Sequence, residues 1–174
     1  MKCLARLMLG VIGTSTMIAC AESPIAPTGV HQSALVTVTA QPVEGFYDLR
    51  FLNTSHVEVA NLQFGQALIL QAHITDAGGN PAQGGSVVFQ YCSLKGYPPN
   101  DIEHVDEAPL EKCEVTGEGT WAHLATRDVD TSGNAEMTFC CSTITPTIGF
   151  RFKYLGQGSG IANRTSVPEN FNWY

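Results

Sequence analysis

Residues 67–91, ALILQAHITDAGGNPAQGGSVVFQY, decide the fold of this chain. Apolar side chains recur at every second position on either side of a central break, at Leu68, Leu70, Ala72 and Ile74 and again at Val87, Phe89 and Tyr91. A period of two places these side chains on one face of a pleated strand. The break itself, residues 76–81, collects Asp, Gly, Asn and Pro, which favour turns. The stretch therefore predicts a strand, a turn and a second strand.

The same alternation recurs along the rest of the chain. In FYDLRFL, residues 46–52, apolar and polar side chains alternate, and in HVEVANL, residues 56–62, Val57 and Val59 are expected to point inward. Further strands are predicted over residues 35–40, 120–126, 135–141, 150–154 and 161–167. Seven to nine short strands joined by turns, without a convincing amphipathic helix, predict an all-β fold: an antiparallel β-sandwich.

Residues 93–119 interrupt the strand pattern. Two prolines follow Tyr97, and proline lacks the backbone donor that a β-ladder requires. The segment is the acidic part of the chain, with seven of its sixteen Asp and Glu residues, at Asp101, Glu103, Asp106, Glu107, Glu111, Glu114 and Glu118. It is expected to be a long acidic surface loop between two strands, and loops of this length are often functional. The candidate binding residues in it are Tyr97, Asp101, Glu103, Asp106 and Glu107.

The first nineteen residues are expected to be a signal peptide. Lys2 and Arg6 precede an apolar run over residues 7–19 that is too short to span a bilayer. The run ends in Met17-Ile18-Ala19-Cys20, which resembles a bacterial lipobox and makes Cys20 the candidate lipidation site. The alternative is ordinary cleavage at the A-x-A pattern that begins at Ala19, followed by secretion. Residues 20–33 lack periodicity and would form a flexible tether.

Four cysteines remain after such a leader: Cys92, Cys113, Cys140 and Cys141. An even number in an oxidising compartment favours disulfides, and the spacing is poor for zinc because no C-x-x-C pair occurs. A vicinal bond between Cys140 and Cys141 would be strained. Two arrangements remain: Cys92 and Cys113 each bond to one of the vicinal cysteines, or Cys92 bonds to Cys113.

Charge and motifs exclude several function classes. The net charge is −7 and no cluster of Lys or Arg is present, which argues against nucleic-acid binding. Residues 128–133 imitate the start of a calcium loop, but the position of the bidentate Glu falls at Phe139. The histidines are scattered, although His73 and His123 could meet on adjoining strands. We therefore expect no catalysis, no metal site and no cofactor.

Several of these blocks together resemble a known family. Residues 74–81 (ITDAGGNP), 85–89 (GSVVF) and 126–135 (TRDVDTSGNA) are similar to the motifs of bacterial immunoglobulin-like domains of the invasin/intimin type, also called Big-1 domains. The similarity covers most of residues 34–165 and leaves residues 166–174 as a C-terminal tail. It implies an immunoglobulin-like sandwich, interrupted here by the extra material at residues 93–119.

The sequence thus predicts a non-catalytic module of the bacterial cell surface. The expected location is the outer membrane, reached through a lipid anchor on Cys20, or the periplasm or cell surface. The expected role is adhesion, binding or structural support, with a protein or glycan as the partner. Four aromatic residues are candidates for a binding face, with the last three expected to be exposed: Tyr91, Tyr97, Trp173 and Tyr174. The alternative function is a secreted metal- or glycan-binding accessory protein of an extracellular enzyme system.

Overall fold

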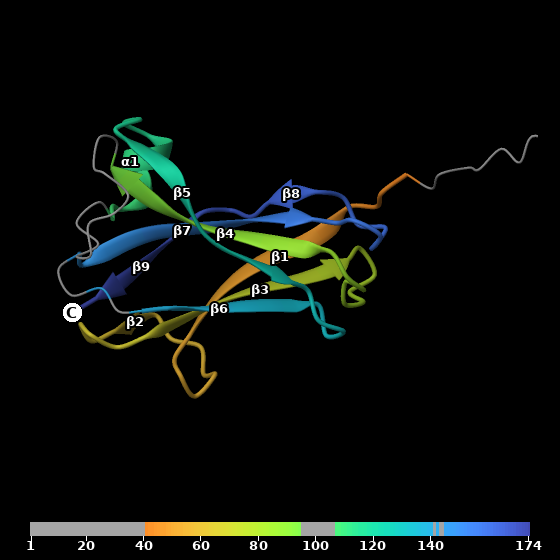
Figure 1. The fold of residues 1–174 in the computed structure, drawn as a ribbon, viewed down its shortest axis with the longest axis horizontal. Coiled ribbons are helices and arrows are strands. Elements are labelled where there is room, and N and C mark those ends of the chain that lie inside the picture. Colours follow the sequence, from red (N-terminus) through yellow and green to blue (C-terminus); the bar gives the residue numbers. More distant parts are fainter. Residues whose placement is uncertain (1–40, 95–106, 141, 143–144) are drawn as a thin grey trace, which may run out of the picture. The chain divides into compact units, whose positions relative to one another are not determined.

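Two β-sheets pack face to face in the computed structural model, which describes residues 41–94, 107–140, 142 and 145–174 (Figure 1). The smaller sheet has the order β1-β3-β6, all antiparallel, with β1 at Gly45–Leu52, β3 at Leu68–Asp76 and β6 at Asn134–Phe139. The larger sheet has the order β2-β9-β7-β4-β5, with β2 at Asn61–Leu62, β9 at Glu169–Trp173, β7 at Thr147–Leu155, β4 at Ser86–Leu94 and β5 at Gly119–Asp128.

Two short strands and one short helix complete the larger sheet. The strand β8, Arg164–Thr165, pairs with the end of β7, and β2 runs parallel to β9 at the sheet edge. The helix α1 covers only Leu110–Glu114. The all-β sandwich predicted from the sequence is confirmed. The division of strands is that of an immunoglobulin-like fold, with β4, β7 and β9 in the positions of strands C, F and G.

The stretch that decides the fold does not form a hairpin. The strand β3 pairs with β1 and β6, whereas β4 pairs with β5 and β7, so residues 77–85 carry the chain from one sheet to the other. The turn is held by Asp76, whose Oδ1 accepts hydrogen bonds from the backbone N–H groups of Gly78 (2.8 Å) and Asn80 (2.9 Å). Hydrogen bonds from the Asn80 side chain, together with these backbone bonds, lower the pKa of Asp76.

Two of the motif blocks that carry the family resemblance meet in space. The backbone N–H of Ile74 donates to the carbonyl of Gly133 over 2.8 Å. Gly133 has φ +77°, and a Cβ there would lie 2.4 Å from the carbonyl oxygen of Ile74 and 3.0 Å from Pro81. Only glycine satisfies both the backbone conformation and this close approach. The second block therefore closes against the end of β3 and the turn that follows it.

The core lies between the two sheets and follows the predicted alternation. On β3 the side chains of Leu68, Leu70, Ala72 and Ile74 are fully buried, and on β7 so are those of Ile148, Phe150, Phe152 and Tyr154. Aromatic rings bridge the sheets: Phe51 on β1 lies 6.1 Å from Phe150, and Phe139 on β6 lies 5.2 Å from Phe150. The inner faces of the two sheets thus form one continuous apolar layer.

The predicted strand over residues 56–62 is wrong except at its end. Only Asn61 and Leu62 form β2, and Val57, which was expected to point inward, is 57% exposed. Asn53 explains the difference, since its Oδ1 accepts hydrogen bonds from the backbone of Ser55 and Val57 and closes a local turn. The expected strand at residues 35–40 lies outside the described residues.

The sandwich extends beyond residue 165. Residues 166–174, expected to be a tail, contain β9, and the predicted strand over residues 161–167 is limited to β8. Phe171 is 1% exposed and Trp173 is 3% exposed, so the expected exposure of Trp173 is wrong, whereas Tyr174 is exposed. Two aromatic residues spaced by two, in ENFNW, are enough to complete the inner face of the larger sheet.

We predict that Phe171→Ala destabilises the protein by about 3 to 5 kcal/mol, because it removes a fully buried ring and leaves a cavity in the core. Tyr174→Ala, the control at the exposed neighbouring aromatic, should change stability by less than about 0.5 kcal/mol. Urea unfolding followed by circular dichroism measures both. Equal, small effects would show that the C-terminal residues lie outside the folded domain.

Candidate functional site

The two ends of the acidic segment are attached to the sandwich at the same position, beside the end of β4. Glu107 pairs with Ser93 in an isolated antiparallel bridge. The N–H of Ala108 donates to the carbonyl of Cys92 (2.9 Å), and its carbonyl accepts from Gly149 on β7 (2.9 Å). Both ends of the segment are therefore tied to the backbone at the end of β4 and the start of β7.

Glu107 is the one candidate binding residue of this segment that the structure describes. It is 4% exposed, so its expected exposure on the loop surface is wrong, whereas its binding role stays a prediction. The reason is its pairing with Ser93, which draws the returning chain against the sheet. The other candidates, Tyr97, Asp101, Glu103 and Asp106, lie outside the described residues, as does Cys20.

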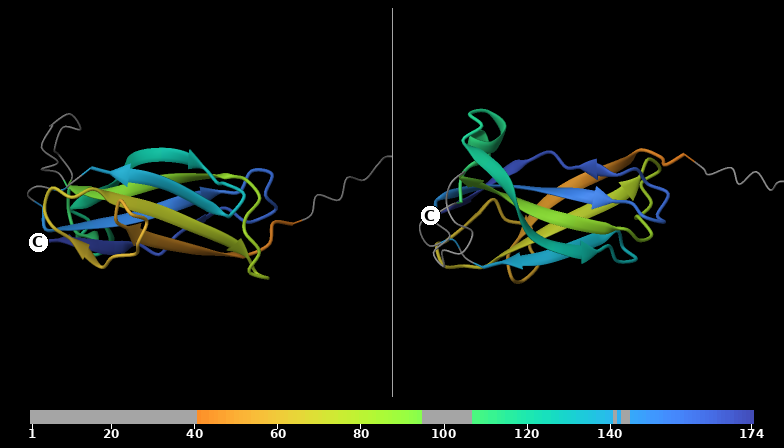
Figure 2. Two further views of the ribbon diagram at one scale, coloured as in Figure 1. Left: turned by 90° about the horizontal axis from the view of Figure 1, so that it is seen from below. Right: turned by 45° about the horizontal axis from the view of Figure 1, so that its top comes forward.

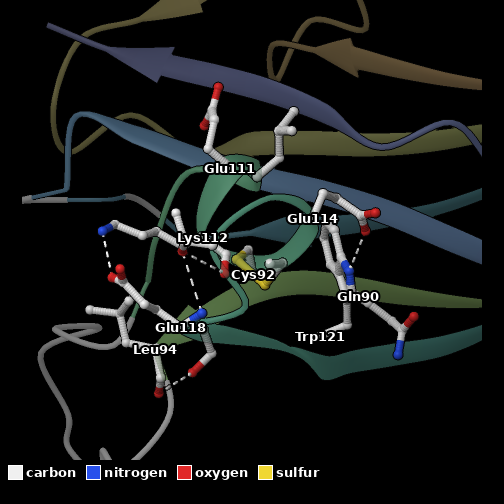
Figure 3. The surroundings of a disulfide bond; sticks show 12 residues. Gln90, Cys92, Leu94, Glu111, Lys112, Glu114, Glu118 and Trp121 are labelled. Carbon is white, nitrogen blue, oxygen red and sulfur yellow. Dashed lines mark hydrogen bonds and ion pairs between the residues drawn. A yellow bond between two sulfur atoms is a disulfide. The ribbon is translucent and has the colours of Figure 1, made fainter.

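A disulfide closes the segment, between Cys92 on β4 and Cys113 in α1, across 21 positions of sequence (Figure 3). This selects one of the two arrangements that the sequence left open. Cys140, the candidate partner in the other arrangement, is an exposed free cysteine, and Cys141 lies outside the described residues. A cross-link that closes a loop of this length stabilises a fold by about 3 kcal/mol in the chain-entropy account.

The helix α1 lies across the outer face of the larger sheet, at the end where the segment is tied (Figures 1 and 3). Its first N–H, at Leu110, donates to Oδ1 of Asn170 on β9 (2.8 Å), and Asn170 Nδ2 donates to Glu111 (3.2 Å). Gly149 makes the close approach possible, because a Cβ there would lie 2.6 Å from the Leu110 nitrogen. With the disulfide to β4 and a hydrogen bond to Trp121 on β5, the helix thus contacts four strands of the sheet.

Four side chains beside the disulfide form a polar group that we call the outer-face cluster: Gln90, Glu114, Trp121 and Arg151. Trp121 Nε1 donates to Glu114 Oε1 over 2.7 Å, and the Arg151 guanidinium lies 4.3 Å from the centre of the Trp121 ring. Arg151 Nε donates to Gln90 Oε1 (3.0 Å), and its Nη1 lies 3.6 Å from Glu114 Oε1. Desolvation lowers the pKa of Arg151, and the nearby Glu114 carboxylate partly opposes this.

The outer-face cluster escaped prediction because its members are far apart in sequence. It depends on strand register: Gln90 is opposite Arg151 on β7, and Cys92 is opposite Trp121 on β5. A bulge between Phe89 and Gln90 also shifts the pairing of β4 with β5. The only sequence signal for it is the alternation of FRFKY, residues 150–154, which places Arg151 on the face opposite to the aromatic residues.

The charged surface around α1 remains acidic in the described residues. Glu111, Glu114 and Glu118 are exposed there, and Lys112 Nζ lies 2.6 Å from Glu118 Oε2. The hydrogen bond and charge of Lys112 lower the pKa of Glu118. This pair is exposed to solvent, so it adds little to stability. Since Arg151 pairs with Glu114 as Lys112 does with Glu118, these five charged residues leave one net negative charge around α1.

The candidate metal ligands are not brought together. His73 on β3 contacts Oδ1 of Asn134 (2.7 Å), and His123 on β5 contacts Thr126 (3.2 Å), so the two histidines belong to different sheets. Asp130, in the calcium-like stretch, accepts two backbone hydrogen bonds of its own turn. Among the described residues no group of three or more His, Cys, Asp or Glu side chains is placed to hold a metal ion.

A hollow lies between the end of β1, residues 58–60 and β9. It is lined by Phe51, Glu58, Val59, Ala60, Glu169 and Asn170. Partial burial raises the pKa of Glu169, and the carboxylates of Asp48 and Glu58 raise it further. Keeping the Glu169 carboxylate ionised in this hollow therefore lowers the free energy of unfolding.

Comparison with known proteins gives no family assignment. No protein-family model matches this chain, and no curated protein does. The immunoglobulin-like resemblance therefore depends on the motifs and on the strand order of the sandwich. Within the part of the chain that the structure describes, no helix has the length and apolar character needed to cross a membrane.

We predict that Glu169→Gln stabilises the protein at pH 7, by at most about 0.5 kcal/mol because solvent screens the charges. The raised pKa means that the folded state binds this proton more tightly than the unfolded chain, so stability falls as pH rises through the pKa. At pH 3, where the carboxyl is protonated in both states, the gain should disappear.

Urea unfolding at the two pH values measures this effect. Glu44→Gln is the control, because Glu44 pairs with Arg164 over 2.7 Å and its loss should not stabilise the protein. A loss of stability in Glu169→Gln at pH 7, or an equal gain at both pH values, would contradict the account.

Proposed function

We propose that this chain is an exported, non-catalytic immunoglobulin-like module of the bacterial cell surface. In this proposal it is anchored through a lipid on Cys20 and binds a protein or glycan through the acidic segment, residues 93–119. The leader pattern, the lipobox-like residues 17–20 and the tether that follows support export and anchoring. The Cys92–Cys113 disulfide is consistent with an oxidising compartment. The motif blocks and the strand order support kinship with invasin/intimin-type domains.

The observation that carries the binding role is the way the acidic segment is tied to the sandwich. The Ser93–Glu107 bridge, the Ala108 hydrogen bonds and the disulfide hold both of its ends on strands of a packed core. Binding residues in proteins are concentrated on loops that a rigid scaffold positions. A long segment with fixed ends suits recognition better than it suits a connection between strands, which a few residues would make.

The binding role is tested by replacing residues 96–105 with a short Gly/Ser linker that keeps both Cys92 and Cys113. Soluble wild-type chain is first applied to a glycan array and to immobilised extracellular matrix proteins, and the strongest binding surface is then used for the variant. We expect at least a tenfold loss of affinity, because the acidic and aromatic side chains of the segment are removed.

A matched control replaces residues 156–160, the Gly-rich loop at the other end of β7, with the same linker. It should bind like the wild type. Equal binding by both variants, or no binding by the wild type, would contradict the proposal. Binding that disappears with a chelator would favour the alternative of a metal-dependent accessory protein.

The anchoring part is tested by mass spectrometry of the protein exported from a bacterial host. We expect an N-terminus at an acylated Cys20 and recovery in the membrane fraction. The matched variant Cys20→Ser should lose the acyl mass and the membrane association, because the acceptor thiol is gone. An unmodified N-terminus at Glu22 in the wild type would overturn the lipid anchor and leave a secreted protein.

A further inference from the structure

The helix α1 has few means of holding its own place. It has five residues, none of them buried, and no side chain caps its start at Pro109. Helices this short do not persist in water on their own, since nucleation is costly. Its position on the outer face of the larger sheet must therefore come from bonds to the strands beneath it.

One of those bonds is covalent, and the side-chain hydrogen bonds and the ion pair are polar. The chain before the helix is held by the backbone bonds of Ala108, and Leu110 packs closely on Gly149. The polar contacts are Leu110 and Glu111 with Asn170, and Glu114 with Trp121 and Arg151. They lie at or near the solvent-exposed surface, where water replaces such contacts with small net loss. The Cys92–Cys113 bond is the contact that water cannot replace (Figure 3).

We propose that α1 is a disulfide-locked cover on the outer face of β4, β5 and β7, which is released when a dithiol reductant cleaves the Cys92–Cys113 bond. Release uncovers Trp121, Arg151 and the strip of β7 at Gly149. It also opens the covalent ring that contains residues 95–106. The inference does not require the proposed binding role, since it concerns the fold alone.

The two sulfur atoms of the disulfide differ in how easily a reductant reaches them. Cys92 is fully buried, whereas Cys113 is partly exposed, so a reductant thiolate reaches the Cys113 sulfur. Attack there forms a mixed disulfide with Cys113 and expels Cys92 as a thiolate, which takes up a proton. The second thiol of the reductant then displaces Cys113 as a thiol. Two electrons and two protons pass to the protein, and the dithiol becomes a disulfide.

The sandwich itself does not depend on this bond. The strand β4 keeps its pairing with β5 and β7 on either side, and Val87 and Phe89 remain in the core. Reduction should therefore act locally, on residues 110–118, while the backbone bonds of Ala108 to Cys92 and Gly149 remain. The two tryptophans separate the local event from a global one, because Trp121 belongs to the outer-face cluster and Trp173 is buried in the core.

The test measures acrylamide quenching of tryptophan fluorescence in the full processed chain, before and after reduction with dithiothreitol. In Trp173→Phe, where Trp121 is the only tryptophan, the quenching constant of the tryptophan emission should rise at least twofold on reduction. In Trp121→Phe, where Trp173 remains, it should not change. Cys113→Ser in the Trp173→Phe background should show the high value without reductant.

Hydrogen exchange of the wild-type chain provides a second measurement that needs no core substitution. Amides of residues 110–115 should exchange at least tenfold faster after reduction, and those of β7 should be unaffected. Unchanged quenching of Trp121 and unchanged exchange after complete reduction would overturn the proposal. Parallel changes at Trp121, Trp173 and β7 would also overturn it, since they would show that the bond supports the whole fold.

Discussion

Apolar packing between the inner faces of the two sheets, to which β3 and β7 contribute most, is the constraint on which the rest of the structure depends. Each strand contributes four fully buried side chains to the layer between the sheets. Burial of that size dominates the favourable side of folding. Once these faces are turned inward, the pleat fixes which side chains of the neighbouring strands point outward. The outer-face cluster and the disulfide occupy such outward positions.

The two faces of the larger sheet have different chemistry as a result. Its inner face is aromatic and continuous with the core, whereas its outer face carries Gln90, Cys92, Trp121 and Arg151 at one end. The helix α1 lies over that end (Figure 2). The acidic segment is anchored at the same end of the sheet. The sandwich is common to immunoglobulin-like folds and holds the segment in place, whereas the segment itself is the feature that distinguishes this chain.

The sequence was sufficient for the faces of the strands but not for their partners. Alternation of apolar and polar residues identified the buried side chains of β3, β4 and β7, because it shows which face of a strand is covered. It does not state which sheet a strand joins, and β3 and β4 therefore looked like a hairpin although they belong to different sheets. The short strand β9 was missed because its signal is only two aromatic residues near the end of the chain.

The candidate site was less predictable still. The acidic composition of residues 93–119 is plain in the sequence, but the burial of Glu107 follows from a bridge to Ser93 that no local pattern reveals. The disulfide pairing and the outer-face cluster both require the register of three strands, one of which contains a bulge. Sequence patterns act over a few residues, whereas these contacts join residues 7 to 61 positions apart.

The central claim is that the acidic segment is a closed excursion from a rigid sandwich, with Cys92 bonded to Cys113. Mass spectrometry of proteolytic peptides from the unreduced protein, with free thiols alkylated first, tests it most directly. The account predicts a cross-linked peptide pair that contains Cys92 and Cys113, and an alkylated Cys140. A peptide pair that joins Cys92 or Cys113 to Cys140 or Cys141 would contradict it.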